Sequence, residues 1–264
     1  MNKFLLGIVS CVLFSGCITL SEKNSVLKEE SKRKIYICKK ITEKIRIDGI
    51  LNEKVWKKAV PVCEFYEIGP RKNILLPYKN AEVRFLYDDK FLYIGAIIND
   101  EDIVADPDSP KYEKTKLFLE GDTFEVFIQP EEDNPTYFEL HVNPVGAMWD
   151  ARFIAQRYMK FYNPANWDSN MIYAVKYEGT LNKIDKDKGW TVEMAIPFSS
   201  LRNKDGKVYE VKRGTKWRVS ISLYDFSYYY DNGGSHSSLK YVSSSKLKYL
   251  DFHRRQDYNF LEFE

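Results

Sequence analysis

The sequence lacks the short motifs that mark several enzyme classes. No glycine-rich phosphate loop and no H-E-x-x-H, C-x-x-C or G-x-S-x-G pattern occurs in it, and its three histidines lie far apart. Glycoside hydrolysis needs two facing carboxylates, but Asp122 and Glu125 are three apart on a predicted strand and point to opposite faces. Glu125 and Glu139 can share a face of adjacent strands, yet acidic residues are common on strand surfaces. We therefore expect a protein that is not an enzyme.

The sequence also lacks an imbalance of charge. Its 40 Lys and Arg residues against 38 Asp and Glu residues leave a formal net charge of +2. A nucleic-acid-binding domain needs a clearly basic face, and no basic patch spaced with aromatic residues occurs here. Nucleic acid is therefore excluded as an expected partner.

A membrane-spanning hydrophobic run is missing from the N-terminus, where a shorter run stands instead. Phe4–Phe14 is apolar but too short to span a bilayer, and it follows a positive Lys3, which is typical of a secretory signal. The letters FSGC, ending at Cys17, resemble the lipobox of bacterial lipoproteins, although Phe14 stands where Leu is usual. We predict a signal peptide over residues 1–16 and lipidation of Cys17, the alternative being a cleaved signal with an incidental cysteine.

The predicted lipoprotein is exported and anchored to a membrane through Cys17. Residues 17–34 are polar, mixed in charge and without periodicity, which favours a flexible tether. Ile18 is not the Asp that retains some lipoproteins at an inner membrane, so an outer membrane or cell surface is expected. Cysteine is otherwise scarce. Cys38 and Cys63 can pair as a disulfide in an exported protein or stay free, and the sequence leaves both open.

What the sequence has in abundance is alternation of apolar and polar residues. Aromatic residues make up 15% of the chain, which favours strands. In the stretch YFELHVNPVGAMWDARF, the residues Phe138, Leu140 and Val142 alternate with Glu139, His141 and Asn143, so the two sets face opposite ways.

Many short strands with little helix predict an all-β domain over residues 35–264. We expect an antiparallel β-sandwich of two sheets, of jelly-roll or immunoglobulin type, with short helical segments. Leu51–Ala59 is expected to form one or two helical turns. Phe226–Ser238, rich in Gly and Ser, is expected to be a long surface loop.

Four segments in order resemble the family 9 carbohydrate-binding modules and their relatives. They are IRIDGILNEKVWKKA, DTFEVFIQP with YFELHVNPVGAMWD, GWTVEMAIPFSSL with GTKWRVSISLYD, and the closing FHRRQDYNFLEFE. The resemblance covers nearly all of residues 41–264. It implies a β-sandwich that binds a polysaccharide or oligosaccharide without catalysing a reaction.

The resemblance also places a sugar site. The family's Glu falls on Glu125, its Arg position is taken by His141 with Asn143 beside it, and its two stacking tryptophan positions by Leu119 and Phe252. His cannot fork across two hydroxyls as Arg does, and Leu offers no π-face, so the resemblance implies a changed ligand or none. Other aromatic platforms are expected as well, and the residues considered are Phe118, Trp149 and Trp167. For Trp167 the alternative is that it opens the next strand and packs inward.

Relatives in this family often hold calcium. The acidic loop Asn99–Asp108 contains Asp100 and Asp102, whose oxygen atoms suit a hard cation such as Ca²⁺, although the loop lacks the twelve-residue calcium pattern. A solvated acidic loop is the alternative, and no other cofactor is expected.

Two further functions stay open beside glycan binding. Similar sandwiches carry haem, and His141 with Met148 or Met159 is a conceivable ligand pair. A structural or protein-interaction lipoprotein that kept the fold and lost the sugar site is the other alternative, favoured by Leu119 and His141.

Overall fold

The computed structural model describes residues 33–69, 75–111, 121–154, 167–231 and 234–264. The predicted signal peptide, Cys17 and most of the predicted tether lie outside them. Residues Lys34–Glu264 form one compact unit. The strands are β1 (Ile35–Lys40), β2 (Phe65–Ile68), β3 (Leu75–Tyr78), β4 (Ala81–Tyr87), β5 (Phe91–Ile98), β6 (Thr123–Gln129), β7 (Tyr137–Val142), β8 (Met148–Phe153), β9 (Ile172–Glu178), β10 (Gly189–Pro197), β11 (Lys216–Asp231), β12 (Gly234–Ser243) and β13 (Asn259–Phe263).

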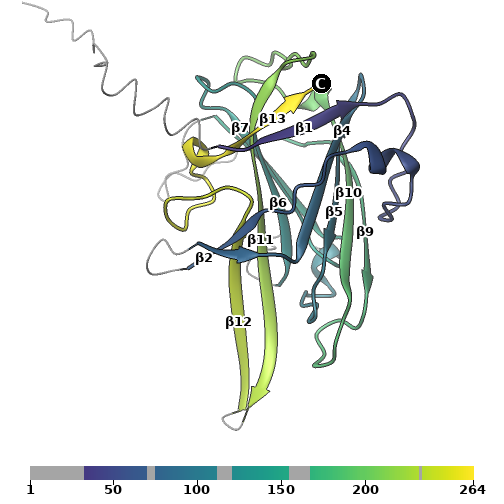
Figure 1. Ribbon diagram of the computed structural model, residues 1–264, viewed down its shortest axis with the longest axis vertical. Helices are drawn as coiled ribbons and strands as arrows, with labels where there is room; N and C mark the ends of the chain where they lie inside the picture. Colours follow the sequence, from purple (N-terminus) through teal and green to yellow (C-terminus); the bar gives the residue numbers. More distant parts are fainter. Residues whose placement is uncertain (1–32, 70–74, 112–120, 155–166, 232–233) are drawn as a thin grey trace, which may run out of the picture. The chain divides into compact units, whose positions relative to one another are not determined.

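The predicted all-β sandwich is confirmed. One sheet runs in the order β8-β7-β6-β11-β12-β2-β3, with β13 beside the start of β11, and the other runs β4-β5-β10-β9. Figure 1 shows the two sheets lying face to face. Helix is limited to short 3₁₀ segments in the described residues, namely η1 (Lys54–Lys58), η2 (Ser109–Lys111), η4 (Phe198–Ser200) and η5 (Arg255–Asp257).

Strand β1 belongs to both sheets and departs from the antiparallel pattern. Residues Ile35–Cys38 pair in parallel with β13, and Lys39 and Lys40 pair in parallel with β4. All the other strand pairs of the described residues are antiparallel. Strand β1 therefore lies between β13 and β4 and joins the two sheets at one end of the sandwich.

The main core fills the space between the two sheets, where period-two alternation predicted it. Phe138, Leu140 and Val142 of β7 are fully buried there, as expected. They pack with the inward residues of β6, β4 and β5. Those residues are Phe124, Val126, Ile128, Val83, Phe85, Tyr87, Leu92, Ile94, Ala96 and Ile98.

The opposite face of β6, β7 and β8 is also covered, which the alternation did not predict. A second apolar cluster packs on it, built partly from the segment between β12 and β13. Its buried members are Ile68, Phe127, Tyr137, Trp149, Ala151, Phe153, Leu247, Phe252 and Tyr258. This part of the sheet therefore carries apolar packing on both faces, and its polar residues are enclosed.

A third cluster explains the IDG…W segment near the start of the domain. Trp56 of η1 is 2% exposed and packs with Leu86, Tyr93 and Ala195. Its indole N–H donates to Glu193 Oε1 at 2.9 Å, while Glu193 Oε2 accepts the backbone N–H groups of Asp48 and Gly49, also at 2.9 Å. One carboxylate of β10 thus fixes both the turn and the 3₁₀ segment.

Of two local expectations, the structure corrects one and bears out the other. Phe226–Ser238, expected to be a loop, lies mostly within the hairpin of β11 and β12, which extends past the other strands in Figure 1. The one or two helical turns expected over Leu51–Ala59 are present as the five-residue 3₁₀ segment η1. At the hairpin, strand pairing overrides the local composition.

The two cysteines of the domain are both free. Cys38 is fully buried in the main core, whereas Cys63 is exposed. Burial raises the pKa of the Cys38 thiol well above its ordinary value. The open question of a Cys38–Cys63 disulfide is therefore answered by free thiols.

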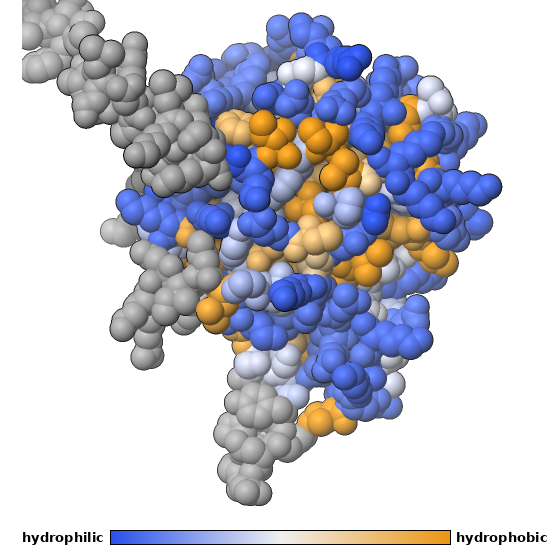
Figure 2. Space-filling view, in the orientation of Figure 1, coloured by the Kyte–Doolittle hydropathy of each residue, from blue (hydrophilic) through white to orange (hydrophobic). Residues whose placement is uncertain are grey.

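The surface in the view of Figure 2 is mostly hydrophilic, with apolar residues gathered near its middle. In the described part of the chain, no helix has the length and hydropathy needed to cross a membrane.

Candidate functional site

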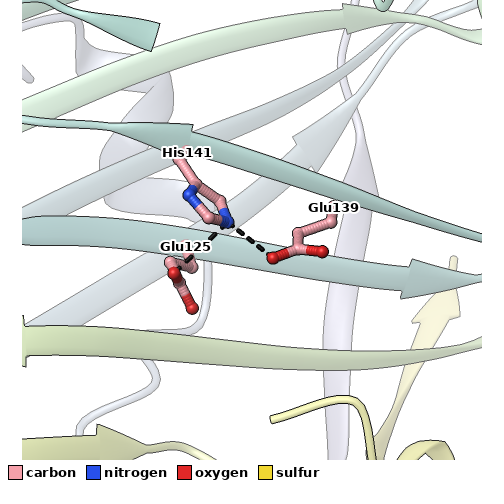
Figure 3. Close-up of side chains that lie close together, drawn as sticks. All are labelled: Glu125, Glu139 and His141. Atoms are coloured by element: carbon pink, nitrogen blue, oxygen red, sulfur yellow. Dashed lines mark hydrogen bonds and ion pairs between the residues drawn. The ribbon is translucent and has the colours of Figure 1, made fainter. Parts of the chain in front are cut away.

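Glu125, Glu139 and His141 come together on the covered face of β6 and β7. Glu125 is the direct cross-strand partner of His141, and Glu139 lies two residues before His141, so all three side chains share one face. His141 Nε2 lies 2.8 Å from Glu139 Oε1 and 3.2 Å from Glu125 Oε1. Figure 3 shows the imidazole reaching both carboxylates. The predicted juxtaposition of Glu125 and His141 is therefore present.

These polar side chains are buried. Glu125 is 1% exposed, Glu139 is 3% exposed and His141 is fully buried. Taking a carboxylate out of water costs on the order of several kcal/mol unless an opposing charge or hydrogen bonds compensate. The cluster is therefore held by strong local interactions, of which the imidazole–carboxylate contacts are two.

Aromatic side chains surround the cluster. Trp149 of β8 is the cross-strand partner of His141, and the two ring centroids lie 4.8 Å apart. His253 Nε2 lies 3.8 Å from Glu139 Oε2, and its Nδ1 lies 2.9 Å from the Tyr137 hydroxyl. Sequence reasoning placed Trp149 among the candidates but missed His253, although the closing FHRRQ segment was part of the family resemblance.

Phe252 lies beside this face, but its ring is already packed. It is 7% exposed, and its centroid lies 5.4 Å from that of Tyr224 and 6.4 Å from that of Phe127. Its proposed role as a stacking platform for a sugar stays a prediction. The structure adds a packing role that the sequence did not reveal.

Asn143 serves the turn between β7 and β8. Its Oδ1 accepts the backbone N–H of Ala147 at 2.8 Å, and its Nδ2 donates to Ser109 Oγ at 2.9 Å. Both ends of the amide are therefore engaged with the protein, and Asn143 is 2% exposed. Its expected contact with a sugar stays a prediction.

Trp167 lies on the wrong side of the sheet for this site. Its ring packs 5.0 Å from that of Phe138, which faces the main core, and its indole N–H donates to the Ser200 carbonyl at 2.8 Å. Trp167 is partly buried and packs against the main core, as the inward-packing alternative expected, so it does not serve as a platform on the face of Glu125. Leu119 and Phe118 lie outside the described residues.

The two aspartates of the acidic loop accept hydrogen bonds from the backbone. Asp100 Oδ1 accepts the backbone N–H of Asp102, and Asp102 Oδ2 accepts the backbone N–H of Tyr228. Desolvation by burial raises the pKa of Asp100 to about 6, and burial raises the pKa of neighbouring Asp122 well above its ordinary value. The expected role of Asp100 and Asp102 as calcium ligands stays a prediction.

The haem alternative loses one of its ligand pairs. Met148 is the cross-strand partner of Val142, which faces the main core, whereas His141 pairs with Trp149 on the opposite face. The Met148 and His141 side chains therefore lie on opposite sides of one sheet and cannot bind the same iron. Met159 lies outside the described residues.

Comparison with known proteins agrees with this architecture. The family model described as "Carbohydrate family 9 binding domain-like" matches residues 47–214, and no curated protein matches the chain. A putative carbohydrate-binding protein from Bacteroides uniformis ATCC 8492 superposes with a TM-score of 0.61 at 15% identity, covering 88% of this chain and 100% of that one.

Two solved structures of a family 9 carbohydrate-binding module from Caldicellulosiruptor kristjanssonii are also similar. The complex with cellotriose has a TM-score of 0.52 at 13% identity, with 88% of this chain and 94% of that chain covered. The complex with glucose has a TM-score of 0.54 at 12% identity, with 88% and 96% covered. At these identities the similarity shows the shared fold.

Proposed function

The chain belongs to the carbohydrate family 9 binding domain-like family, and on that premise we propose that it is a non-catalytic glycan-binding lipoprotein. Its ligand is an oligosaccharide or polysaccharide. Similar folds hold cellotriose and glucose in the solved complexes from Caldicellulosiruptor kristjanssonii, which supports this class of ligand.

The observation that carries the proposal is the polar and aromatic face of β6, β7 and β8. Glu125 and His141 are adjacent there, and Trp149 and Phe252 flank them. Sugar recognition combines an aromatic ring against the apolar face of the sugar with charged groups that bond its hydroxyls. Because these side chains are buried, binding requires the rings that cover them to move.

Glycan binding is tested with an array of plant, host and bacterial glycans, followed by calorimetry with cellotriose and glucose. Glu125→Gln removes the charge while keeping the shape of the side chain. It should weaken the binding of any glycan that the array identifies at least tenfold. Glu178→Gln is the matched control, because Glu178 lies exposed on β9 of the other sheet. A protein that binds no glycan, or a Glu125→Gln variant that binds as the parent does, contradicts the proposal.

The lipid anchor belongs to the same proposal. An apolar signal followed by Ser15-Gly16-Cys17 supports lipidation of Cys17, which places the domain at an outer membrane or cell surface on a short tether. Mass spectrometry of the mature N-terminus should find a diacylglyceryl group on Cys17. Cys17→Ser should release the protein from the membrane fraction, and an unchanged distribution contradicts the anchor.

A second candidate is a structural or protein-interaction lipoprotein that keeps the fold without a sugar site. The burial of Glu125, His141 and Asn143 favours it, since a packed face offers a ligand little surface. The same glycan array separates the two candidates.

A further inference from the structure

We propose that Glu125, Glu139 and His141 form a binding site for a divalent first-row transition cation such as Zn²⁺. One ligand atom from each residue lies within 4.8 Å of the other two, and this is the only such group of three or more His, Cys, Asp or Glu residues in the described part of the chain. The inference concerns the face discussed above, but it does not depend on glycan binding.

The spacing of the ligand atoms suits one small ion. Atoms bound at about 2.0–2.2 Å to the same ion lie about 2.8–3.5 Å from one another in tetrahedral or octahedral geometry. His141 Nε2 lies 2.8 Å from Glu139 Oε1 and 3.2 Å from Glu125 Oε1. The nitrogen therefore already has the spacing to both carboxylates that shared coordination needs.

Burial and charge favour a cation at this point. Two carboxylates meet one imidazole, and the exposed fractions of their side chains are 2%, 4% and 0% for Glu125, Glu139 and His141. Carboxylates taken out of water require an opposing charge close by. A divalent cation supplies two positive charges at the point where both carboxylates and the imidazole converge.

The scaffold holds the three ligands in place. Glu125 and His141 are paired across β6 and β7, and Glu139 is on the same strand as His141, so all three lie on sheet backbone rather than on loops. Trp149 packs against the His141 ring and restricts its orientation.

Ser222 of β11 provides a second, independent sign of a ligand. It is the cross-strand partner of Glu125 on the other side of β6 and therefore shares its face. Its hydroxyl is buried and has no hydrogen-bond partner among the described residues. Buried hydroxyls are normally bonded, so this oxygen, beside Glu125, is placed to serve a bound ion or an ion-bound water.

The donor set selects the class of ion. Imidazole nitrogen suits Zn²⁺ and its transition-metal neighbours, whereas Ca²⁺ takes six to eight oxygen ligands. One nitrogen and two carboxylate oxygens therefore favour Zn²⁺ over Ca²⁺. Because Nε2 must give up its hydrogen to bind, uptake of the ion should also release a proton at a pH where the imidazole nitrogen carries one.

The test is a calorimetric titration of the chelator-stripped, lipidated protein with ZnCl₂, without glycan. Cys63→Ser is used as the background, because Cys63 is an exposed thiol that could compete for zinc. One zinc per protein should bind, at least tenfold more tightly than Ca²⁺. Glu125→Gln, Glu139→Gln and His141→Gln should each weaken zinc binding at least thirtyfold, and Glu178→Gln should leave it unchanged.

Absence of stoichiometric zinc binding overturns the proposal, as do variants that bind zinc as tightly as the parent or a preference for Ca²⁺. Where a variant fails to fold, zinc X-ray absorption of the Cys63→Ser parent decides instead. A spectrum with one imidazole among oxygen ligands supports the site, and a spectrum without imidazole overturns it. Since no glycan is present, a failure here is distinct from a failure on the glycan array.

Discussion

The indole N–H of Trp56 donates to the carboxylate of Glu193 at 2.9 Å, across 137 residues of sequence. The same carboxylate accepts two backbone N–H groups from the Asp48-Gly49 turn. Two of the segments that carry the family resemblance, IRIDG…VW and GWTVE, are therefore held together by hydrogen bonds to the Glu193 carboxylate. Their role in the fold is structural.

Replacement of Glu193 by Ala should destabilise the protein strongly. It leaves three donors without their acceptor, and loss of a buried charged hydrogen-bonding group costs about 3–5 kcal/mol. Urea denaturation followed by tryptophan fluorescence measures the change. Glu178→Ala on the exposed neighbouring strand should leave the free energy of unfolding nearly unchanged. Similar free energies of unfolding for the two variants would contradict a stabilising role of the hydrogen bonds to Glu193.

Gly189→Ala should also destabilise the fold, for a reason of space and backbone conformation. Gly189 has a φ of +128°, and an added Cβ would clash with the Ile98 carbonyl oxygen. A backbone strained in this way costs about 1–3 kcal/mol before the steric clash is added. Gly206→Ala is a matched comparison, because φ is also positive there while the surrounding space is open. The melting temperature of Gly189→Ala should be well below that of Gly206→Ala.

Phe252→Ala and Glu125→Gln should separate packing from binding. Phe252 lies within the second cluster, so truncation leaves a cavity and should cost about 3–5 kcal/mol. Glu125→Gln keeps the side-chain volume and should leave the melting temperature nearly unchanged. It should weaken the binding of the proposed ligand. Calorimetric melting checks both variants. A Phe252→Ala variant as stable as the parent would show that the ring does not pack as described.

Asp100→Asn should stabilise the protein at neutral pH. The folded pKa of Asp100, raised by burial to about 6, lies above its ordinary value of 3.8. The folded state therefore holds more protons between these values, and the contribution of Asp100 to stability falls as pH rises from about 4 to about 6. Asparagine has no charge to bury.

The expected gain for Asp100→Asn is about 1–2 kcal/mol at pH 7 and near zero at pH 4. Urea denaturation of both proteins across this pH range measures the difference. A difference that stays flat from pH 4 to pH 7 would contradict the raised pKa. The charge of Asp100 also raises the pKa of Asp122, so the stability of Asp122→Asn is measured in the same pH series.

The faces of individual strands could be predicted from the sequence, because side-chain alternation is local. Phe138 and Leu140 face the core as expected, and Glu125 meets His141 as the resemblance implied. The covering of the opposite face could not be predicted, since it depends on the segment that carries Phe252 returning over β6 and β7. The inward packing of Trp167 was one of two interpretations that the sequence left open.

The hairpin of β11 and β12 shows a second limit. Gly and Ser around residues 226–238 favour a loop when read alone, but each strand gains a full ladder of hydrogen bonds from the other. Ser222 gave no signal in the sequence, because its importance comes from register with Glu125 on β6. Pairing between strands, rather than local composition, decided both features.

The double pairing of β1 sets the order in which the chain can reach its native state. Its Ile35 pairs with Phe260, and the adjoining Lys34 N–H donates to the side chain of Asn259, 225 residues later. The first strand of the domain therefore has no partner in one of its two sheets until the last strand has been synthesised. Contacts so remote in sequence slow folding, so the nascent chain remains open until its C-terminus is complete. Under the export that we propose for this chain, this delay is an advantage.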